Sequence, residues 1–313
     1  MRHYPRLAFD DVKTSSVAHR TNLVTLANMA RPGEETEPLW QAPGFTDLVS
    51  SIVEARRRDR PVIWSMGAHV VKNGLSRYVI ELVERGWVTH VAGNGATTIH
   101  DFELAYLGGT SEDVATAIED GTFGMWEETG RWMNAAIQAA ADRGQGYGEG
   151  IASYVRDRPA RFPYVHDCII ARTVAAGRPY TCHLTLGTDI IHQHPSVDFG
   201  ALAYCSGRDF ERFCQTVMDL DGGVVLNFGS AVSGPLIFLR ALSLAHHLGR
   251  PVRPLAAANF DLRPEPVAPS RARSDFLEPV IGLGGLGWSF TVSHEASIPS
   301  LYRHLIRHEE GRR

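Results

Sequence analysis

Short apolar runs alternate with longer amphipathic segments along most of the chain. The runs lie at residues 62–66, 87–92, 179–186, 223–228, 252–258 and 288–292. A continuous apolar run of four to eight residues is typical of a strand buried on both faces, as in a parallel sheet covered by helices. The pattern predicts one α/β domain over residues 61–313, with a doubly wound, mostly parallel sheet, and an N-terminal extension over residues 1–60.

Helices are predicted where apolar residues recur every three to four positions and where boundary residues begin or end the pattern. The segments are 45–58, 75–85, 101–107, a helix opened by residues 110–113, 127–143, 166–176, 209–220, 236–248 and 298–307. Residues 144–150 are rich in glycine and are predicted to form a turn. Residues 263–279 are rich in proline and are predicted to form a loop.

The composition excludes several functional classes. The 313-residue chain carries a formal charge of −4 and has an isoelectric point near 6.4, so no general positive field attracts nucleic acid. No apolar stretch approaches the ~20 residues of a membrane span, and the first residues lack the apolar run of a secretory signal. Four scattered cysteines without a CxxC pair indicate buried, reduced thiols and a cytoplasmic protein.

Polar residues and glycines collect where the predicted strands end. Because ligands bind beyond the carboxyl ends of parallel strands, we expect the cofactor-binding residues there, namely Gly67, His69, Gly93, Asn94, Gly95, Asp101, Glu103, Gly229, Ser230, Asn259, Asp261, His294 and Glu295. The stretch 93–95 could bring backbone N–H groups to a phosphate. It is shorter than the GxGxxG fingerprint, and glycines that merely form tight turns explain it equally well.

Two basic side chains are candidates for catalysis. Lys72 is one of only two lysines, the other being Lys13. A lysine one turn beyond a strand end can hold a phosphate or carboxylate, or form a Schiff base when desolvated; the alternative is a solvated lysine at a helix start. His100 precedes two carboxylates and can perform acid–base chemistry, although acidic residues are also common at helix starts.

A second group of candidates is Asp189 with His192 and His194. These residues are predicted to act on the substrate as bases or hydrogen-bonding groups. Alternate residues of an extended segment point the same way, so the two imidazoles could instead bind a divalent metal such as zinc, with Asp189, His69 or Asp101 completing the ligands. The remaining alternative is a polar loop whose histidines hydrogen-bond to the backbone.

The order of these motifs resembles that of the deoxyhypusine synthase family, and its bacterial deoxyhypusine-synthase-like branch in particular. The segments 63–75, 90–103, 187–192, 226–232 and 293–297 carry the resemblance, which spans roughly residues 61–306. It implies a Rossmann-type fold that binds NAD and assembles as a homodimer or homotetramer. It further implies NAD contacts from Gly93, Asn94, Gly95, Asp101 or Glu103, and from Glu295 and Ala296.

The chain departs from that family at two places. The family's catalytic lysine precedes the last strand, where this chain reads Gly-Leu-Gly-Gly-Leu-Gly over residues 282–287, and the family's pocket histidine is replaced by residues 233–235, Ser-Gly-Pro. Transfer through an imine at the usual place is therefore excluded, and authentic deoxyhypusine synthesis is not expected. Lys72 is a candidate to replace the missing lysine, as a covalent group or as a charge.

Three hypotheses about function follow. The first is an NAD-dependent oxidoreductase or transferase that acts on a small amine or amino-acid-like substrate. The second is a metal-dependent hydrolase or lyase on the same fold. The third is a nucleotide-binding protein without catalytic activity.

Overall fold

The computed structural model describes residues 4, 6–35, 37–263 and 276–311. Its central element is a six-stranded sheet in the order β5-β3-β2-β6-β7-β8, in which every neighbouring pair is parallel. The strands are β2 (Val62–Met66), β3 (His90–Gly93), β5 (Tyr180–Cys182), β6 (Val224–Phe228), β7 (Ala256–Asp261) and β8 (Leu286–Thr291). The predicted α/β class with a doubly wound parallel sheet is confirmed.

The strand order fixes the position of a ligand crevice. The chain moves from β2 outward to β3 and β5, then returns to the other side of β2 and continues through β6, β7 and β8. This is the order 3-2-1-4-5-6 of dinucleotide-binding sheets, in which the connections leave the sheet in opposite directions at the point of reversal. The reversal lies between β2 and β6, so the loops that begin at Gly67 and Gly229 flank this position, which we call the crevice.

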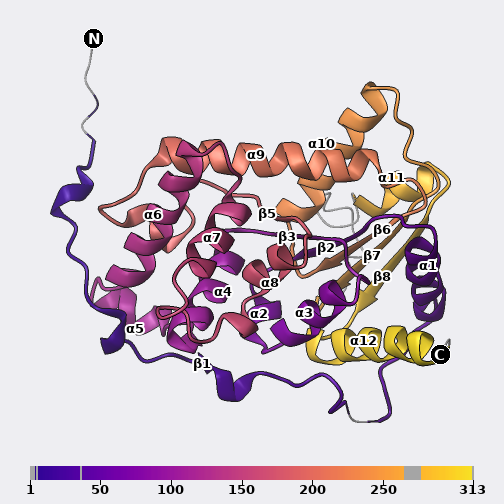
Figure 1. Cartoon of the computed structure of the whole chain (residues 1–313), viewed down its shortest axis with the longest axis horizontal. Coiled ribbons are helices and arrows are strands. Elements are labelled where there is room, and N and C mark those ends of the chain that lie inside the picture. Colours follow the sequence, from indigo (N-terminus) through magenta and orange to yellow (C-terminus); the bar gives the residue numbers. More distant parts are fainter. Residues whose placement is uncertain (1–3, 5, 36, 264–275, 312–313) are drawn as a thin grey trace.

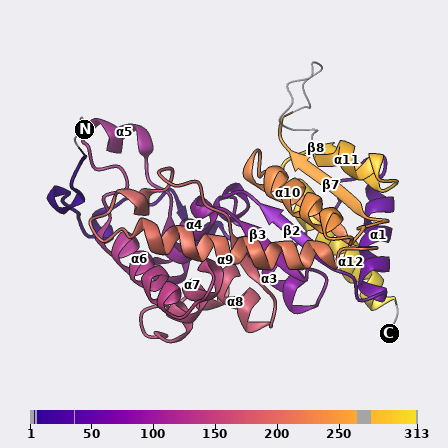
Figure 2. The same ribbon diagram turned by 90° about the horizontal axis from the view of Figure 1, so that it is seen from above.

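Helices cover both faces of the sheet (Figures 1 and 2). One face packs against α9 (Phe199–Met218), α10 (Ser233–His247) and α11 (Leu277–Gly282). The opposite face packs against α1 (Phe45–Arg57), α2 (His69–Lys72), α3 (Ser76–Glu84) and α12 (His294–Glu310). No helix in the described part of the chain is both long and apolar enough to cross a membrane.

The two faces of the sheet carry different side chains because successive residues of a strand point to opposite faces. On the α12 side, Phe228 stacks on Trp64 at 4.0 Å and on Phe260 at 4.4 Å between ring centroids. On the α10 side, a polar row runs across neighbouring strands in register, from Ser65 through Asn227 and Asn259 to Ser289. The aromatic face therefore supplies core packing, and the polar row lies near the strand ends that face the crevice.

A helical layer extends the molecule beyond the β5 edge (Figure 1). It consists of α4 (Gly95–Leu107), α5 (Val114–Glu119), α6 (Glu127–Asp142), α7 (Tyr147–Arg156) and α8 (Ile169–Ala175). The turn predicted at residues 144–150 is largely the start of α7. A Cβ on Gly148 would lie 2.1 Å from the carbonyl oxygen of Tyr180, so this glycine permits close helix packing.

The N-terminal segment is part of the packed structure. Strand β1 (Val24–Thr25) pairs antiparallel with β4 (Gly109–Thr110), and α1 contributes Phe45 and Leu48 to the main core. Short 3₁₀ helices occur at Phe9–Asp11, Val17–His19 and Leu26–Asn28, and two more at Val165–Asp167 and Ile190–Gln193. Residues on both sides of the boundary predicted near residue 60 therefore contribute to one core.

Several predicted elements differ in extent from those of the structure. The run at 179–186 contains only the three-residue β5, because the chain turns away after Cys182. The helix predicted at 209–220 begins ten residues earlier, where the Asp198 side chain caps α9. Most of the loop predicted at 263–279 lies outside the described residues. All four cysteines are buried and unpaired, as predicted.

Gly67 provides a test of how tightly the crevice loops pack. A Cβ at this position would lie 2.6 Å from the backbone oxygen of Gly229, and backbone atoms cannot yield as a flexible side chain can. We expect Gly67→Ala to lower the free energy of unfolding by about 1–3 kcal/mol, measured by urea denaturation. The control is Gly207→Ala in the exposed face of α9, where a Cβ meets nothing within 4 Å; an equal loss in both variants would contradict the packing argument.

Asp209 joins α9 to β5 and α7. Its Oδ2 accepts hydrogen bonds from the backbone N–H groups of Cys182 at 2.7 Å and Gly148 at 3.0 Å. Burial raises the pKa of Asp209 to about 7. The folded state therefore keeps a proton that the unfolded chain loses above about pH 4, so this group's contribution to stability falls as the pH rises from 4 to 7.

We expect Asp209→Asn to become progressively more stable than the wild type between pH 4 and pH 8, by a few kcal/mol at the upper end. The amide oxygen keeps both hydrogen bonds, and the amide nitrogen replaces the protonated oxygen. Thermal or urea unfolding at several pH values measures the difference. The surface change Asp219→Asn is the control and is expected to show no such trend; an advantage for Asp209→Asn that is constant with pH would refute the assignment.

Candidate active site

A cavity of about 190 Å³ lies at the start of α4 and carries most of the titratable groups of this region. Its charged and titratable lining residues are Arg20, Lys72, His100, Glu103, Glu112 and Asp189. We call it the Lys72 pocket. Three of the five predicted catalytic residues, Lys72, His100 and Asp189, lie together in it, although they come from three separate segments of the chain.

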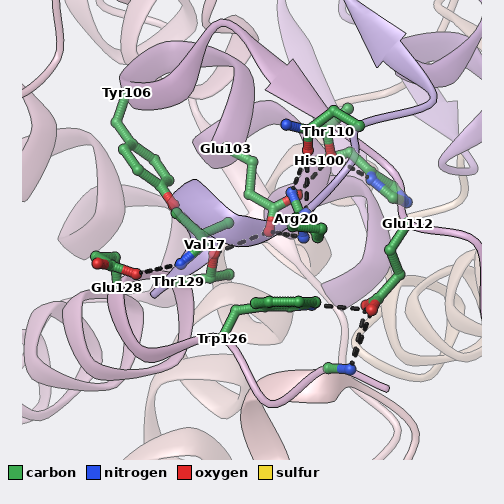
Figure 3. A network of polar contacts seen from close by, with 12 residues as sticks. Val17, Arg20, His100, Glu103, Tyr106, Thr110, Glu112, Trp126, Glu128 and Thr129 are labelled. Carbon is green, nitrogen blue, oxygen red and sulfur yellow. Dashed lines mark hydrogen bonds and ion pairs between the residues drawn. The ribbon is translucent and has the colours of Figure 1, made fainter. Parts of the chain in front are cut away.

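A buried ion pair forms one wall of the Lys72 pocket (Figure 3). Arg20 donates to both oxygens of Glu103, each at 2.8 Å, and both side chains are almost fully buried. Glu103 also accepts hydrogen bonds from Thr129 at 2.8 Å and Thr110 at 2.6 Å. With four donors on two oxygens, the carboxylate of Glu103 is fully paired. Its two oxygens are therefore occupied by donors from the protein.

Thr110 connects this ion pair to His100. The Thr110 hydroxyl has one proton, which it donates to Glu103 because a carboxylate can only accept. Thr110 Oγ1 must then accept from His100 Nδ1, 2.8 Å away. The His100 ring is therefore protonated on Nδ1, and Nε2 carries a free lone pair. The site contains an unprotonated imidazole nitrogen whose orientation is set by two buried residues.

Burial keeps the His100 imidazole neutral. It lowers the pKa of His100 to about 4, with smaller contributions from the charges of Lys72 and Arg20, and the charge of Glu103 opposes the shift. Lys72 has no hydrogen bond or ion pair within the described part of the chain. A substrate carboxylate that paired with Lys72 would remove one of the charges that lower the His100 pKa, and would strengthen His100 as a proton acceptor.

Two carboxylates complete the Lys72 pocket. Glu112 accepts hydrogen bonds from Trp126 Nε1 at 2.9 Å and from the Gly124 backbone at 3.2 Å, and burial raises its pKa. The carboxylate of Asp189 lies against Gly95, where an added Cβ would be 1.8 Å from Oδ2. Burial raises the pKa of Asp189 to about 6, and Oδ2 has no hydrogen-bond partner among the described residues. The same side chain caps the 3₁₀ helix at Ile190–Gln193 by accepting from the His192 backbone, so Oδ2 is its oxygen without a hydrogen bond.

His192 packs against Asp189 and holds the loop that carries it. Its Nδ1 accepts hydrogen bonds from the backbone N–H groups of Gly187 and Asp189, at 3.1 and 3.2 Å. The remaining proton is therefore on Nε2, which lies 3.6 Å from Asp189 Oδ2. Burial lowers the His192 pKa. This histidine holds the 187–189 loop and is not among the residues that line the Lys72 pocket.

The metal alternative does not match the arrangement of the donors. Residues 190–193 form a 3₁₀ helix, so His192 and His194 do not point the same way as an extended segment would require. His194 turns to Ser196 at 2.7 Å and Glu127 at 3.3 Å, and burial lowers its pKa. No group of three or more His, Cys, Asp or Glu side chains in the described residues is placed to bind a metal; the set of His69, Asp189, His192 and His194 is not assembled.

Asp101, predicted as a cofactor ligand, is enclosed in the core. Its oxygens accept hydrogen bonds from the backbone of Ile169 and Ile170, at 2.8 and 2.9 Å, and from Cys168. Burial raises its pKa to about 6. Asp101 therefore caps the start of α8. Its prediction as a cofactor ligand is wrong, because a carboxylate that accepts from two backbone N–H groups and has no exposed surface cannot reach a cofactor.

The residues of the stretch 93–95 also make their close contacts within the protein. The side chain of Asn94 accepts from the Thr97 backbone and hydroxyl, both at 2.9 Å, and so caps α4. A Cβ on Gly93 would lie 2.3 Å from the Tyr180 hydroxyl oxygen. Neither glycine has a positive φ. Gly93 and Gly95 lack a side chain because neighbouring side chains occupy the space that a Cβ would need. This reason for glycine is neither the phosphate-binding turn nor the tight turn that the sequence analysis considered.

The other predicted cofactor residues lie around the crevice between β2 and β6. Asn227 Nδ2 donates to Asn259 at 2.8 Å and to the Ser230 carbonyl at 3.0 Å, and Ser230 Oγ accepts from the Gly234 backbone. Gly229 has φ +68° and lies against His294. Asn227 Oδ1 and His294 Nδ1 are buried without a partner among the described residues.

The remaining predicted positions lie near the same strand ends. Glu295 accepts from Asn73 at 2.8 Å, and the Ala296 backbone is capped by Ser293. Asp261 pairs with Arg263. His69 begins α2, and its charge lowers the pKa of both His100 and His294, so it lies near the Lys72 pocket and near the crevice. The two sites are therefore neighbours.

Sequence reasoning missed Arg20, Glu112 and Asn227 as site residues. Arg20 lies 83 residues from its partner Glu103, and no local pattern indicates such a pair. Glu112 belongs to a stretch that the sequence assigns to a helix start. Asn227 could have been recognised from the sequence, because it is a polar residue inside an otherwise apolar strand.

Comparison with known proteins finds similarity of fold and not of sequence. No protein family model and no curated protein matches the chain. Among solved structures, a conserved protein of Methanococcus maripaludis S2, provisionally assigned as LOR/SDH, matches with a TM-score of 0.51 and 14% identity, over 89% of this chain and 74% of that one. At this identity the match shows the α/β fold alone.

Two further solved structures match with lower scores. AgrE, solved as a ternary complex with ornithine and NAD⁺, matches with a TM-score of 0.49 and 13% identity over 85% of this chain. A protein of Entamoeba histolytica provisionally assigned as a deoxyhypusine synthase matches with a TM-score of 0.46 and 8% identity, over 85% of this chain and 88% of that one. This chain spans only 33% of the length of AgrE.

The ion pair of Arg20 and Glu103 can be tested directly. We expect Glu103→Gln to lower the free energy of unfolding by about 3–5 kcal/mol, because it leaves the Arg20 charge buried and unpaired. Urea denaturation measures the change. The control is Glu54→Gln, which breaks exposed pairs with Arg57 and Arg58 and is expected to cost less than about 1 kcal/mol. A loss below that level in Glu103→Gln would show that the pair is not a structural constraint.

Proposed function

We propose that this protein is an NAD-dependent enzyme that oxidises a small amino-acid-like substrate bound in the Lys72 pocket. The observation that carries the proposal is a combination of three groups in a single small cavity. They are an ammonium group without a partner among the described residues, an unprotonated imidazole nitrogen, and one carboxylate oxygen, Asp189 Oδ2, that accepts no hydrogen bond there. An α-amino acid has the complementary groups, because its carboxylate suits Lys72 and its amine suits Asp189.

The size of the Lys72 pocket supports a small substrate. Its volume of about 190 Å³ is below the ~300–1,000 Å³ typical of drug-sized ligands. The lining also includes apolar side chains, among them Ile99, Val114 and Phe123, which can pack against the carbon atoms of a substrate. A free metabolite with two oppositely charged ends fits this lining better than a peptide or a nucleotide does.

The crevice supports the cofactor. Its position at the reversal of strand order is where dinucleotides bind in such sheets, and Asn227 Oδ1 and His294 Nδ1 are buried polar atoms that lack partners among the described residues. Asn227, Ser230, Asn259 and His294 would hold NAD there. When bound, NAD supplies the oxidant, since its nicotinamide ring accepts the hydride that leaves the substrate carbon.

The residues of the Lys72 pocket would perform the remaining work. Lys72 binds the substrate carboxylate and thereby raises the His100 pKa from its depressed value. His100 Nε2 then accepts the proton released from the amine, while Thr110 and Glu103 hold the ring and stabilise the positive charge that it acquires. Asp189, with a pKa of about 6, is largely ionised at neutral pH and orients the amine. Homodimer or homotetramer formation belongs to the same proposal.

The first experiment is calorimetric titration of the full chain with NAD, followed by a screen of amino acids and small amines for NADH formation. We expect micromolar binding of NAD and turnover of a substrate that has both a carboxylate and an amine. Absence of NAD binding would overturn the proposal.

With a substrate in hand, Lys72→Met is expected to raise KM by tenfold or more because the carboxylate loses its counter-charge. Lys72→Arg is the matched control and is expected to retain most of the affinity. His100→Ala is expected to lower kcat by about 10²–10⁴, the usual contribution of a general base. Equal kinetics of Lys72→Met and Lys72→Arg would show that the charge at this position does not bind the substrate.

A further inference from the structure

The two edges of the central sheet differ in how their outward backbone groups are satisfied. At the β5 edge, the N–H group of Cys182 donates to Asp209 Oδ2 at 2.7 Å. Helix α7 lies against the same edge, because a Cβ on Gly148 would be 2.1 Å from the Tyr180 carbonyl oxygen. The opposite edge is β8, and no strand in the described part of the chain pairs with its outer side. The described residues therefore cover one edge of the sheet and leave the other open.

The open edge of β8 presents backbone groups without hydrogen-bond partners. The N–H groups of Leu286 and Val292 donate to the carbonyls of Leu255 and Asp261, each at 3.0 Å. Both bonds point towards β7, and successive residues of a strand direct their backbone groups to opposite sides. The outward-pointing residues are therefore Gly287, Ser289 and Thr291. No described residue bonds to the backbone N–H and C=O groups of these three.

β8 lacks the features that keep open strands from pairing. Natural edge strands are usually protected by charged side chains, proline, a bulge or a covering segment. The six residues Leu-Gly-Trp-Ser-Phe-Thr contain no charge and no proline, and they pair with β7 without a bulge. Trp288, Phe290 and Thr291 are also of the residue types that favour strands. An open edge of this composition is suited to pairing with a further strand.

Exposed apolar side chains flank this edge on both faces of the sheet. Leu286 is 54% exposed and lies on the same face as Phe290, which packs in the core beside α1 and α12. On the other face, Ile281 of α11 is also 54% exposed. It lies over Gly287, where an added Cβ would be 3.0 Å from Ile281 Cδ1. A strand added at β8 would lie against both apolar side chains and remove them from water.

We propose that β8 pairs antiparallel with β8 of a second copy of this chain, about a two-fold axis at Ser289. Ser289 then faces Ser289 of the partner subunit, and on either side of the axis Gly287 faces Thr291 of the partner subunit. Opposed residues whose backbone groups point towards each other exchange two hydrogen bonds in an antiparallel pair. Three such pairs form about six hydrogen bonds, and the two sheets join into one continuous sheet.

The side chains of β8 favour a second copy over an unrelated strand. A residue at a two-fold axis meets its own copy, so a charged residue there would repel itself, whereas two serine hydroxyls can hydrogen-bond. Farther from the axis, Leu286 faces Val292 of the partner subunit, and both side chains are apolar. β8 carries no charge that would select a peptide of the opposite charge.

β8 is then the contact surface of the homodimer that the proposed function includes, and in this respect the interface rests on that proposal. The chemistry does not depend on it, because β8 lies two strands beyond β6 in the sheet, away from the crevice between β2 and β6. A wild type that binds NAD as a monomer would refute the interface alone. A dimer that binds no NAD would refute the proposed oxidation and leave the interface in place.

The first test is the mass of the full chain at micromolar concentration, measured by light scattering after size-exclusion chromatography. We expect at least twice 34.4 kDa for the wild type. Ser289→Lys places two like charges at the axis and is expected to raise the dimer Kd about tenfold or more. The control is Ser243→Lys on the exposed face of α10, which is expected to keep the wild-type mass. A monomeric wild type, or a Ser289→Lys variant paired as tightly as the wild type, would refute the interface.

The second test is an exchange of charges at the axis. Ser289→Glu alone is expected to weaken the dimer as Ser289→Lys does, because two carboxylates then meet at the axis. An equal mixture of the two variants allows Lys to face Glu, and we expect the wild-type mass to return. A mixture of folded variants, checked by circular dichroism, that stays as dissociated as each variant alone would refute an axis at Ser289.

A third measurement needs no variant. Hydrogen exchange of the wild-type chain reports on the backbone N–H groups of Gly287, Ser289 and Thr291, which the interface would bond to the partner subunit. We expect these amides to exchange slowly in the dimer and faster when dilution dissociates it. Fast exchange of all three amides in the dimer would show that another surface holds the two copies together, and would overturn the proposal.

Discussion

The buried ion pair between Arg20 and Glu103 constrains most of the candidate active site. It joins the N-terminal segment to α4, and its carboxylate receives four hydrogen bonds that also fix Thr110 and Thr129. A charge taken out of water is tolerated only when its partners satisfy it fully. The geometry of the whole group is therefore rigid, and the proton on His100 Nδ1 follows from it. One electrostatic requirement in the core thus determines which nitrogen of His100 is open to a ligand.

A second constraint comes from the two faces of the central sheet. The polar row from Ser65 to Asn259 lies on the α9–α10 side, which also carries apolar side chains such as Ala257, Phe213 and Phe238. The opposite face is filled by stacked aromatic rings. The two faces of the sheet thus differ in polarity near the strand ends.

The sequence predicted the class of fold and the edge of the sheet that carries the polar residues, because both depend on local patterns. Continuous apolar runs such as residues 62–66 and 224–228 are readable wherever they occur, and polar residues that follow them mark the carboxyl ends of strands. Lys72, His100 and Asp189 were chosen on this basis, and the structure brings them into one cavity. Helix α7 was missed because its glycines resemble a turn, whereas they serve close packing against β5 and α6.

Other features depend on contacts between residues distant in the chain, and the tertiary structure alone decided them. Arg20 and Glu103 are 83 positions apart, and Asp101 and Ile169 are 68 apart, so no local pattern separates the carboxylate that caps a helix from one that lines a pocket. The divergence of His192 and His194 likewise depends on a short 3₁₀ helix that alternation does not predict. By itself the sequence determined which residues can perform chemistry and at which end of the sheet they lie. Their partners, their protons and their exposure to a ligand were decided by packing, because burial and hydrogen bonding are properties of the assembled core and not of any segment.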